Sequence, residues 1–235
     1  MKSLRWVVFI CLFVSFGFIC PDSPDTVIAA QKIQSEKENV CFRWAFGAVV
    51  GKENERKLIK ITHDTTLKTG DQFKMLVELE EKCFVYLIYH GGQGEMQMLF
   101  PNDLKQFTTN YRLMEKYYIP QADLWFALDE SVGRETFYLL ASAKRLVKLE
   151  ALLADYESSE PAGKPELTTQ ILSEIRATKR KHKKFTAVAE RPVTIGGTVR
   201  GISKKPKAPA YDISKIAVEI RTTDFFSRTF TIEHK

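Results

Sequence analysis

Short apolar runs, separated by polar or glycine-rich breaks, follow one another from residue 40 to residue 141. Residues 83–89 are nearly all apolar, as in a central strand covered on both faces. The glycine-rich segment 90–94 then predicts a hairpin turn. On these criteria, strands are predicted at 40–50, 57–61, 72–80, 83–89, 95–100, 124–128 and 135–141. We expect the strands at 72–80, 83–89 and 95–100 to be consecutive neighbours.

The segment 72–80 alternates between apolar and polar side chains. One face carries Phe73, Met75, Val77 and Leu79, and the other carries Lys74, Glu78 and Glu80. This period of two predicts a half-buried strand, with one face in the core and the other in water.

The pattern becomes helical near Lys144. One helix is predicted before the break at Pro161, and a second begins near Pro165, a residue favoured in a first helical turn. Their apolar positions are Leu146, Leu149, Leu152 and Leu153 in the first helix, and Leu167, Ile171 and Ile175 in the second. Strands are predicted to resume at 191–200, 214–221 and 226–233.

The expected fold is therefore mainly β with an α-helical insertion. It is an antiparallel β-sandwich or partly open barrel that carries a helical hairpin near 145–184. We divide the chain into a flexible leader at 31–39, a β-sandwich-like domain at 40–143, a helical hairpin at 144–184, and carboxy-terminal strands at 185–235 that complete the same domain. A separate carboxy-terminal domain is the alternative.

The first thirty residues have the pattern of a signal peptide. Lys2 and Arg5 precede an uncharged apolar stretch at 6–19, and small residues follow at Ala29 and Ala30. The apolar stretch is shorter than the roughly 20 residues that a membrane-spanning helix needs. We therefore predict cleavage after Ala29 or Ala30, and no transmembrane domain after signal removal.

Two alternatives to cleavage stay open. The segment is retained as an amino-terminal anchor, or it is lipidated at Cys20, which the bulky Ile19 disfavours. All three versions export the rest of the chain. We expect the protein in the periplasm or cell envelope.

Charge is uneven along a chain whose composition, 44% hydrophobic and 11% aromatic, is that of a globular protein. Residues 144–235 carry 19 Lys and Arg against 11 Asp and Glu, a net charge of +8, which leaves −2 for residues 1–143. The most basic run contains Lys179, Arg180, Lys181, Lys183 and Lys184. In an exported protein this run predicts contact with an anionic envelope polymer or lipid headgroups rather than nucleic acid. A solvated helix end is the alternative.

Two cysteines, Cys41 and Cys83, lie beyond the signal segment. In an oxidising compartment they can form a disulfide. The alternative is that Cys83 is a buried thiol within a core strand. The cysteine spacing fits no metal site, and His63 and His90 each stand alone, so no metal or other cofactor is expected.

Six short motifs occur in a fixed order along the chain. They are Leu67-Lys-Thr-Gly70-Asp71, Cys83-Phe-Val-Tyr-Leu-Ile88, Leu99-Phe100-Pro101-Asn102, Tyr118-Ile119-Pro120, Leu128-Asp129-Glu130 with Gly133-Arg134-Glu135-Thr136, and Leu140-Ala141-Ser142. With them, residues 67–153 resemble the bacterial family called domain of unknown function 4384. The chain departs from the family pattern at the hairpin tip 90–94 and at Phe84, where tyrosine is expected. The resemblance implies a module that is exported or envelope-linked, or that is appended to signalling and protease domains, and it supplies no mechanism.

The motif residues have structural explanations. Gly70 can supply a positive φ in a turn whose backbone Asp71 binds, and Pro101 ends a strand because it cannot donate to the ladder. We assign structural roles to Gly70, Asp71, Phe100, Pro101, Asn102, Asp129, Glu130, Gly133, Glu135 and Thr136.

Two functions remain. The first is a non-catalytic binding or scaffolding module, whose partner is an envelope protein or an anionic envelope polymer. The alternative is a hydrolase that uses the turn carboxylates Asp129, Glu130 and Glu135, with His90 as a base. The catalytic hypothesis requires His90 and a carboxylate to converge on one pocket.

Overall fold

The structure is a computed structural model that describes residues 38–52, 55–130, 132–182, 189–192 and 211–235, all within one compact unit at 36–235. Its strands are β1 (Asn39–Val50), β2 (Lys57–Lys60), β3 (Thr65–Leu67), β4 (Gln72–Leu79), β5 (Phe84–His90), β6 (Met96–Phe100), β7 (Lys116–Ile119), β8 (Phe126–Ala127), β9 (Gly133–Ser142), β10 (Ala189–Pro192), β11 (Val218–Thr223) and β12 (Phe225–His234). Its helices are α1 (Gln106–Thr109), α2 (Val147–Ser158), α3 (Lys164–His182) and the 3-10 helix η3 (Ile213–Ile216).

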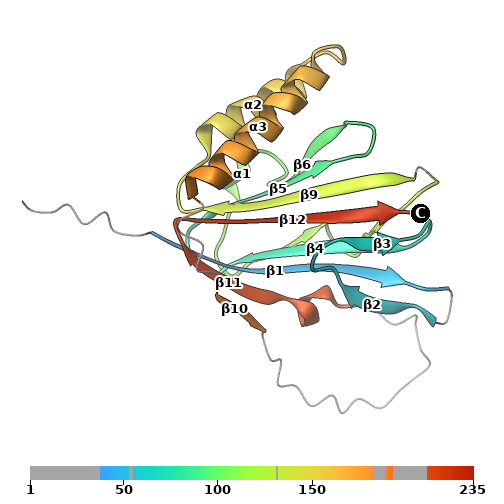
Figure 1. Cartoon of the computed structure of the whole chain (residues 1–235). Coiled ribbons are helices and arrows are strands. Elements are labelled where there is room, and N and C mark those ends of the chain that lie inside the picture. The colour runs from blue at the N-terminus through green and yellow to red at the C-terminus, as the bar shows by residue number, and fades with distance from the viewer. Residues whose placement is uncertain (1–37, 53–54, 131, 183–188, 193–210) are drawn as a thin grey trace, which may run out of the picture. The chain divides into compact units, whose positions relative to one another are not determined.

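The strands form two sheets (Figure 1). The seven-stranded sheet has the order β10-β11-β1-β4-β7, with β2 paired to β1 and β8 paired to β4. The five-stranded sheet has the order β3-β12-β9-β5-β6. Among the described ladders, only β3 with β12 is parallel. This arrangement confirms the predicted antiparallel β-sandwich with a helical insertion.

Aromatic side chains fill the core between the two sheets. Trp44 and Phe46 of β1 face Phe230 of β12, with ring centroids 5.8 and 5.4 Å apart, and Phe46 lies 5.2 Å from Phe137 of β9. All four are at most 2% exposed. Burial of a side chain of this size stabilises a fold by roughly 1.5–3 kcal/mol, so this cluster is a main reason why the sheets stay together.

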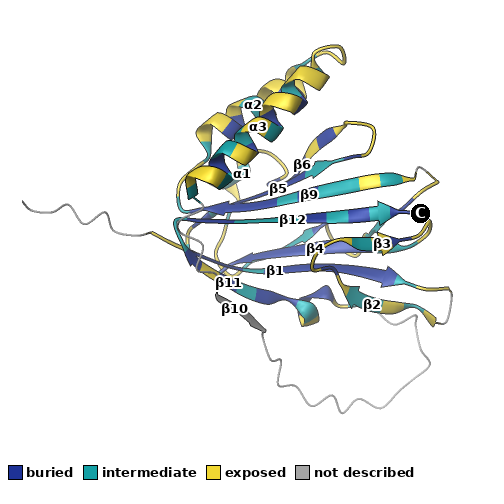
Figure 2. Ribbon diagram, viewed as in Figure 1, coloured by how far each residue is buried: buried dark blue, intermediate teal, exposed yellow. Residues whose placement is uncertain are grey.

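Helices α2 and α3 cover the outer face of the five-stranded sheet (Figures 1 and 2). Leu149 and Leu153 of α2 and Ile171 and Ile175 of α3 are buried against this face, and Tyr86 is among the sheet residues that they contact. These are positions that the helical spacing predicts. Strand β5 is thus covered on both faces, as its apolar sequence indicates.

The prediction that β4, β5 and β6 are consecutive neighbours is confirmed for β5 and β6 and is wrong for β4. Strands β5 and β6 form the predicted hairpin, but β4 belongs to the seven-stranded sheet and β5 to the other. After β4, the amides of Glu80 and Glu81 donate to the Cys41 carbonyl at 3.1 and 3.0 Å, and the chain crosses between sheets. The short polar turn is compatible with either a hairpin or a crossing, so the sequence pattern does not separate them.

The outer face of β4 is buried, contrary to the expectation of a strand with one face in water. Lys74 and Glu78 are 4% and 5% exposed. Between them Leu76 packs in a small cluster with Ile213 of η3 and the half-buried Trp125. The cover comes from segments far along the chain, which the local alternation does not reveal.

The carboxy-terminal strands join both sheets, because β11 pairs with β1 and β12 pairs with β9. The expected strand at 214–221 starts instead as η3, whose Asp212 cap accepts a hydrogen bond from the Ser214 amide at 2.9 Å. Of the expected strand at 191–200, residues 191–192 lie in β10 and the remainder is outside the described residues.

Candidate functional site

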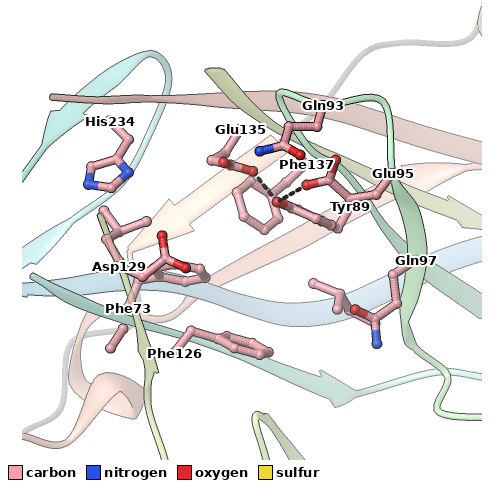
Figure 3. A pocket seen from close by; sticks show the side chains of 13 residues that line it. Phe73, Tyr89, Gln93, Glu95, Gln97, Phe126, Asp129, Glu135, Phe137 and His234 are labelled. Atoms are coloured by element: carbon pink, nitrogen blue, oxygen red, sulfur yellow. Dashed lines mark hydrogen bonds between the residues drawn. The ribbon is translucent and has the colours of Figure 1, made fainter. Parts of the chain in front are cut away.

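A pocket of about 360 Å³ lies at one end of the sandwich, between the two sheets (Figure 3). Its lining side chains are Phe73, Tyr89, Gln93, Glu95, Gln97, Leu99, Phe126, Ala127, Leu128, Asp129, Glu135, Phe137 and His234. Three phenylalanines form its base, the buried Phe73 and Phe137 and the half-buried Phe126, while the exposed carboxylates Glu95 and Asp129 stand at its rim.

The tip of the β5–β6 hairpin forms one wall of the pocket. A Cβ atom on Gly91 would lie 1.8 Å from Glu95 Oε1 and 2.6 Å from the Tyr89 hydroxyl, so only glycine leaves room for that carboxylate. Gly94 has φ +89°, a conformation that glycine adopts without strain. The two glycines therefore let the tip fold back and place Glu95 beside Tyr89.

Tyr89 lies between two carboxylates (Figure 3). Its hydroxyl contacts Glu135 Oε2, and it is 3.2 Å from Glu95 Oε1. Burial, followed by the hydrogen bond to Glu135, raises the pKa of Tyr89 well above its ordinary value. The phenol is therefore protonated at neutral pH, and its single hydrogen can be donated to only one of the two carboxylates at a time.

Three phenylalanine rings make the base. Phe73 of β4 lies 5.2 Å from Phe126 of β8 and 5.6 Å from Phe137 of β9, measured between ring centroids. Tyr89 contacts Phe137 at 5.3 Å. Because the rings come from both sheets, the sandwich core continues directly into the pocket.

The opposite wall is held by the turn that precedes β4. The Gly70 amide donates to the Leu128 carbonyl at 2.9 Å, and the Leu128 amide donates to the Asp71 carbonyl at 3.0 Å. Gly70 has φ +87°, and the Asp71 carboxylate accepts from the Lys68 amide at 2.9 Å. These bonds fix the end of β8, from which Asp129 extends to the pocket rim.

His234 closes the pocket from the last strand. It is 4% exposed, and its Nε2 lies 3.1 Å from Thr69 Oγ1. The Lys235 amide donates to the Leu67 carbonyl at 3.1 Å, which ties the end of β12 to the same turn.

Some of the motif residues stabilise the core and the turns, and others line the pocket. Phe100 is buried and followed by a cis peptide bond to Pro101, and the Asn102 amide donates to Gln106 Oε1 at 2.9 Å. Gly133 and Thr136 lie in β9 and contribute no side chain to the pocket lining. Of the three turn carboxylates, Asp129 and Glu135 line the pocket, whereas Glu130 is exposed outside it.

His90 does not join the carboxylates. Side chains alternate along β5, and Tyr89 belongs with the inter-sheet core while Ile88 packs toward the helices. His90 therefore points to the helix side, and it does not line the pocket. The base expected for the hydrolase hypothesis is not assembled with Asp129 or Glu135.

The basic run is less accessible than expected. Lys179 donates to Thr229 Oγ1 at 3.1 Å, and burial lowers its pKa. Arg180 and Lys181 are exposed at the end of α3, while Lys183 and Lys184 lie outside the described residues.

Cys41 and Cys83 are both buried free thiols. Cys83 belongs to the inter-sheet core and its Sγ lies 3.8 Å from the Cys41 carbonyl. Cys41 faces the other way, with its Sγ 3.9 Å from Glu219. Side chains that point apart cannot be bridged without movement of the backbone, so the geometry favours the buried-thiol alternative.

The described residues contain no group of three His, Cys, Asp or Glu side chains placed to hold a metal ion. Within the described part of the chain, no helix is both long and apolar enough to span a membrane.

Three pocket residues were not predicted from the sequence: Tyr89, Glu95 and His234. Tyr89 lies in a segment with the apolar pattern of a core strand, which gives no sign of a pocket. His234 reaches the site only through tertiary contacts. One signal was present for Glu95, because the hairpin tip 90–94 that precedes it is where the chain departs from the family pattern.

Comparison with known proteins gives one match. Residues 66–145 match the model of the family described as "Domain of unknown function (DUF4384)". The match ends before α2, although the motif resemblance reached residue 153. No curated protein and no solved structure matches the chain significantly. Apart from His234, every side chain that lines the pocket lies in the matched segment. The match confirms, over residues 66–145, the resemblance to this family that the six motifs indicate.

Proposed function

We propose that this protein is an exported, envelope-associated, non-catalytic binding module, and that the pocket receives a side chain of a protein partner. The observation that carries the proposal is the pocket itself, with an aromatic base and polar groups around its rim. Its volume of about 360 Å³ lies within the range of small-ligand sites in proteins, roughly 300–1,000 Å³.

The chemistry of the lining supports binding over catalysis. Within the described residues, no serine, threonine, cysteine or lysine lines the pocket, so a nucleophile of those types is not at hand. The Tyr89 phenol has a raised pKa and contacts two carboxylates. A phenol that keeps its proton at neutral pH cannot accept one as a general base, and it serves here as a hydrogen-bond donor to the carboxylates.

The alternative is a hydrolase that uses Asp129 and Glu135. One observation favours it, because both carboxylates line the same pocket. General acid and base catalysis by two carboxylates needs a substrate between them.

A paired binding and turnover experiment separates the two functions. The complete chain is titrated by NMR with N-acetyl amino-acid amides of basic, acidic, polar, aromatic and aliphatic type, and incubated with chromogenic esters, glycosides and phosphates. We expect saturable shifts for one amide class, loss of those shifts in Phe126→Ala, and no turnover. Turnover that Glu135→Gln abolishes and Glu130→Gln preserves would establish the hydrolase.

Export rests on the amino-terminal sequence, where Lys2 and Arg5 precede the apolar stretch 6–19. Protein recovered from the native host should begin at Ala30 or Gln31 and fractionate with the periplasm or envelope. A product beginning at Met1 in the cytosol contradicts export. A product that begins at Met1 and occurs in the membrane fraction instead shows that the amino-terminal segment is retained as an anchor.

A further inference from the structure

We propose that the pocket binds a guanidinium or ammonium group on an aliphatic stem, as in an arginine or lysine side chain. The inference rests on the proposed function and names the ligand class of the same site.

Two carboxylates of the pocket, Glu95 and Glu135, carry negative charge that the ion pairs among the described residues do not neutralise. Glu95 and Glu135 share one phenol hydrogen, that of Tyr89. Neither carboxylate occurs in an ion pair among the described residues. The neighbouring cation Arg134 binds Glu233 at 2.7 Å. A ligand that supplies several N–H donors and a positive charge would satisfy both carboxylates at once.

The base of the pocket suits the stem of such a ligand. Phe126, which is half-buried, lies across the pocket from Glu135 in Figure 3, and the rings of Phe73 and Phe137 are buried. Aromatic rings bury methylene groups and attract a cation that lies over their faces within about 6 Å. An anionic ligand meets repulsion from the carboxylates, and a neutral one leaves the carboxylate charge unpaired.

The same chemistry occurs elsewhere in the chain. Lys74 Nζ lies 5.2 Å from the centroid of Tyr118 and 5.7 Å from that of Trp125, and it donates to the Leu124 carbonyl at 2.8 Å. There, a buried lysine is held by rings and oxygen acceptors. The pocket offers rings and oxygen acceptors, and its described lining residues include no lysine or arginine.

The test compares two blocked tripeptides by NMR titration of the complete chain: acetyl-Gly-Arg-Gly-amide and the same peptide with citrulline, which is nearly isosteric and uncharged. A lysine tripeptide and free 1,5-diaminopentane are additional arms that distinguish a side chain from a free amine. We expect the arginine peptide to bind about tenfold or more tightly than the citrulline peptide, as expected for hydrogen bonds to charged groups.

Matched variants locate the site. Glu135→Gln and the more exposed Glu95→Gln should each weaken the arginine peptide several-fold, whereas Glu130→Gln, in the nearby turn but outside the pocket, should not. Equal affinity for the arginine and citrulline peptides overturns the inference. So does unchanged affinity for the arginine peptide in both Glu135→Gln and Glu95→Gln.

The outcomes also separate this inference from the proposed function. If another ligand class binds and Phe126→Ala abolishes that binding, the cation inference fails while the binding module stands. If no probe perturbs the pocket resonances, both fail.

Discussion

Tyr86 donates its phenolic hydrogen to Glu150 Oε1 at 2.5 Å, and this bond joins the five-stranded sheet to helix α2. The Tyr86 oxygen also accepts a hydrogen bond from the Leu146 amide at 3.0 Å. Glu150 is 6% exposed and is paired with Arg145 at 2.5 Å. A sheet tyrosine, a helix carboxylate and a loop arginine thus fix where the helical hairpin begins.

Replacing Tyr86 with phenylalanine should reduce the free energy of unfolding by about 1–3 kcal/mol. The reason is that the buried Glu150 carboxylate and the partly buried Leu146 amide each lose a hydrogen-bond partner. Urea denaturation measures the effect. Tyr138→Phe is the control, since Tyr138 packs in the same apolar cluster, and it should cost less than about 0.5 kcal/mol. Equal costs for the two variants would contradict a specific role for the Tyr86 bonds.

Gly91→Ala should weaken the arginine tripeptide about as much as Glu95→Gln does. The new Cβ would occupy the place of the Glu95 carboxylate, which sits at the end of a flexible side chain and can move away at little cost in stability. The NMR titration measures affinity and thermal unfolding measures stability. Gly163→Ala is the control, because a Cβ there meets nothing closer than 3.6 Å. Unchanged affinity in Gly91→Ala would show that Glu95 does not contact the ligand.

Stability should fall as the pH rises above 9, in part through Cys83. Burial raises the pKa of this thiol from 9.0 to about 12. Between these values the unfolded chain releases the proton and the folded chain keeps it, so deprotonation favours unfolding by at most about 1.4 kcal/mol per pH unit. Urea denaturation under reducing conditions at pH 8 to 11 should give a smaller decline for Cys83→Ala than for the original protein. Parallel declines would exclude a raised thiol pKa.

The exposed end of α3 provides a test of the anionic-partner hypothesis. The double variant Arg180→Gln, Lys181→Gln should reduce association with anionic vesicles and leave the thermal midpoint unchanged. Lys179→Gln should instead lower the midpoint, because Lys179 contacts Thr229 on β12. Association should also weaken as added salt shortens the screening length below about 10 Å. If neither the double variant nor added salt changes the association with vesicles, the basic run is a solvated helix end.

Local sequence patterns predicted many of the elements, although β3, β7 and α1 were not among them. The alternation in 72–80, the apolar run at 83–89 and the leucine spacing after Lys144 predicted β4, β5 and α2 to within a few residues. These patterns are local, because side-chain direction repeats every two residues in a strand and about every 3.6 in a helix. The motif order was equally readable, and it led to the family that residues 66–145 match.

How the elements meet depends on long-range contacts, which the local patterns do not contain. The tertiary structure separated β4 from β5, buried Lys74 and Glu78 on a face that looked solvent-exposed, and turned His90 away from the carboxylates that it was expected to serve. The pocket depends on the same long-range contacts, because Phe73, Tyr89 and His234 come from three strands in two sheets. Local periodicity indicates which face of a strand is apolar. The segments that cover each face are set by the packing of the whole unit, and they lie far away in the sequence.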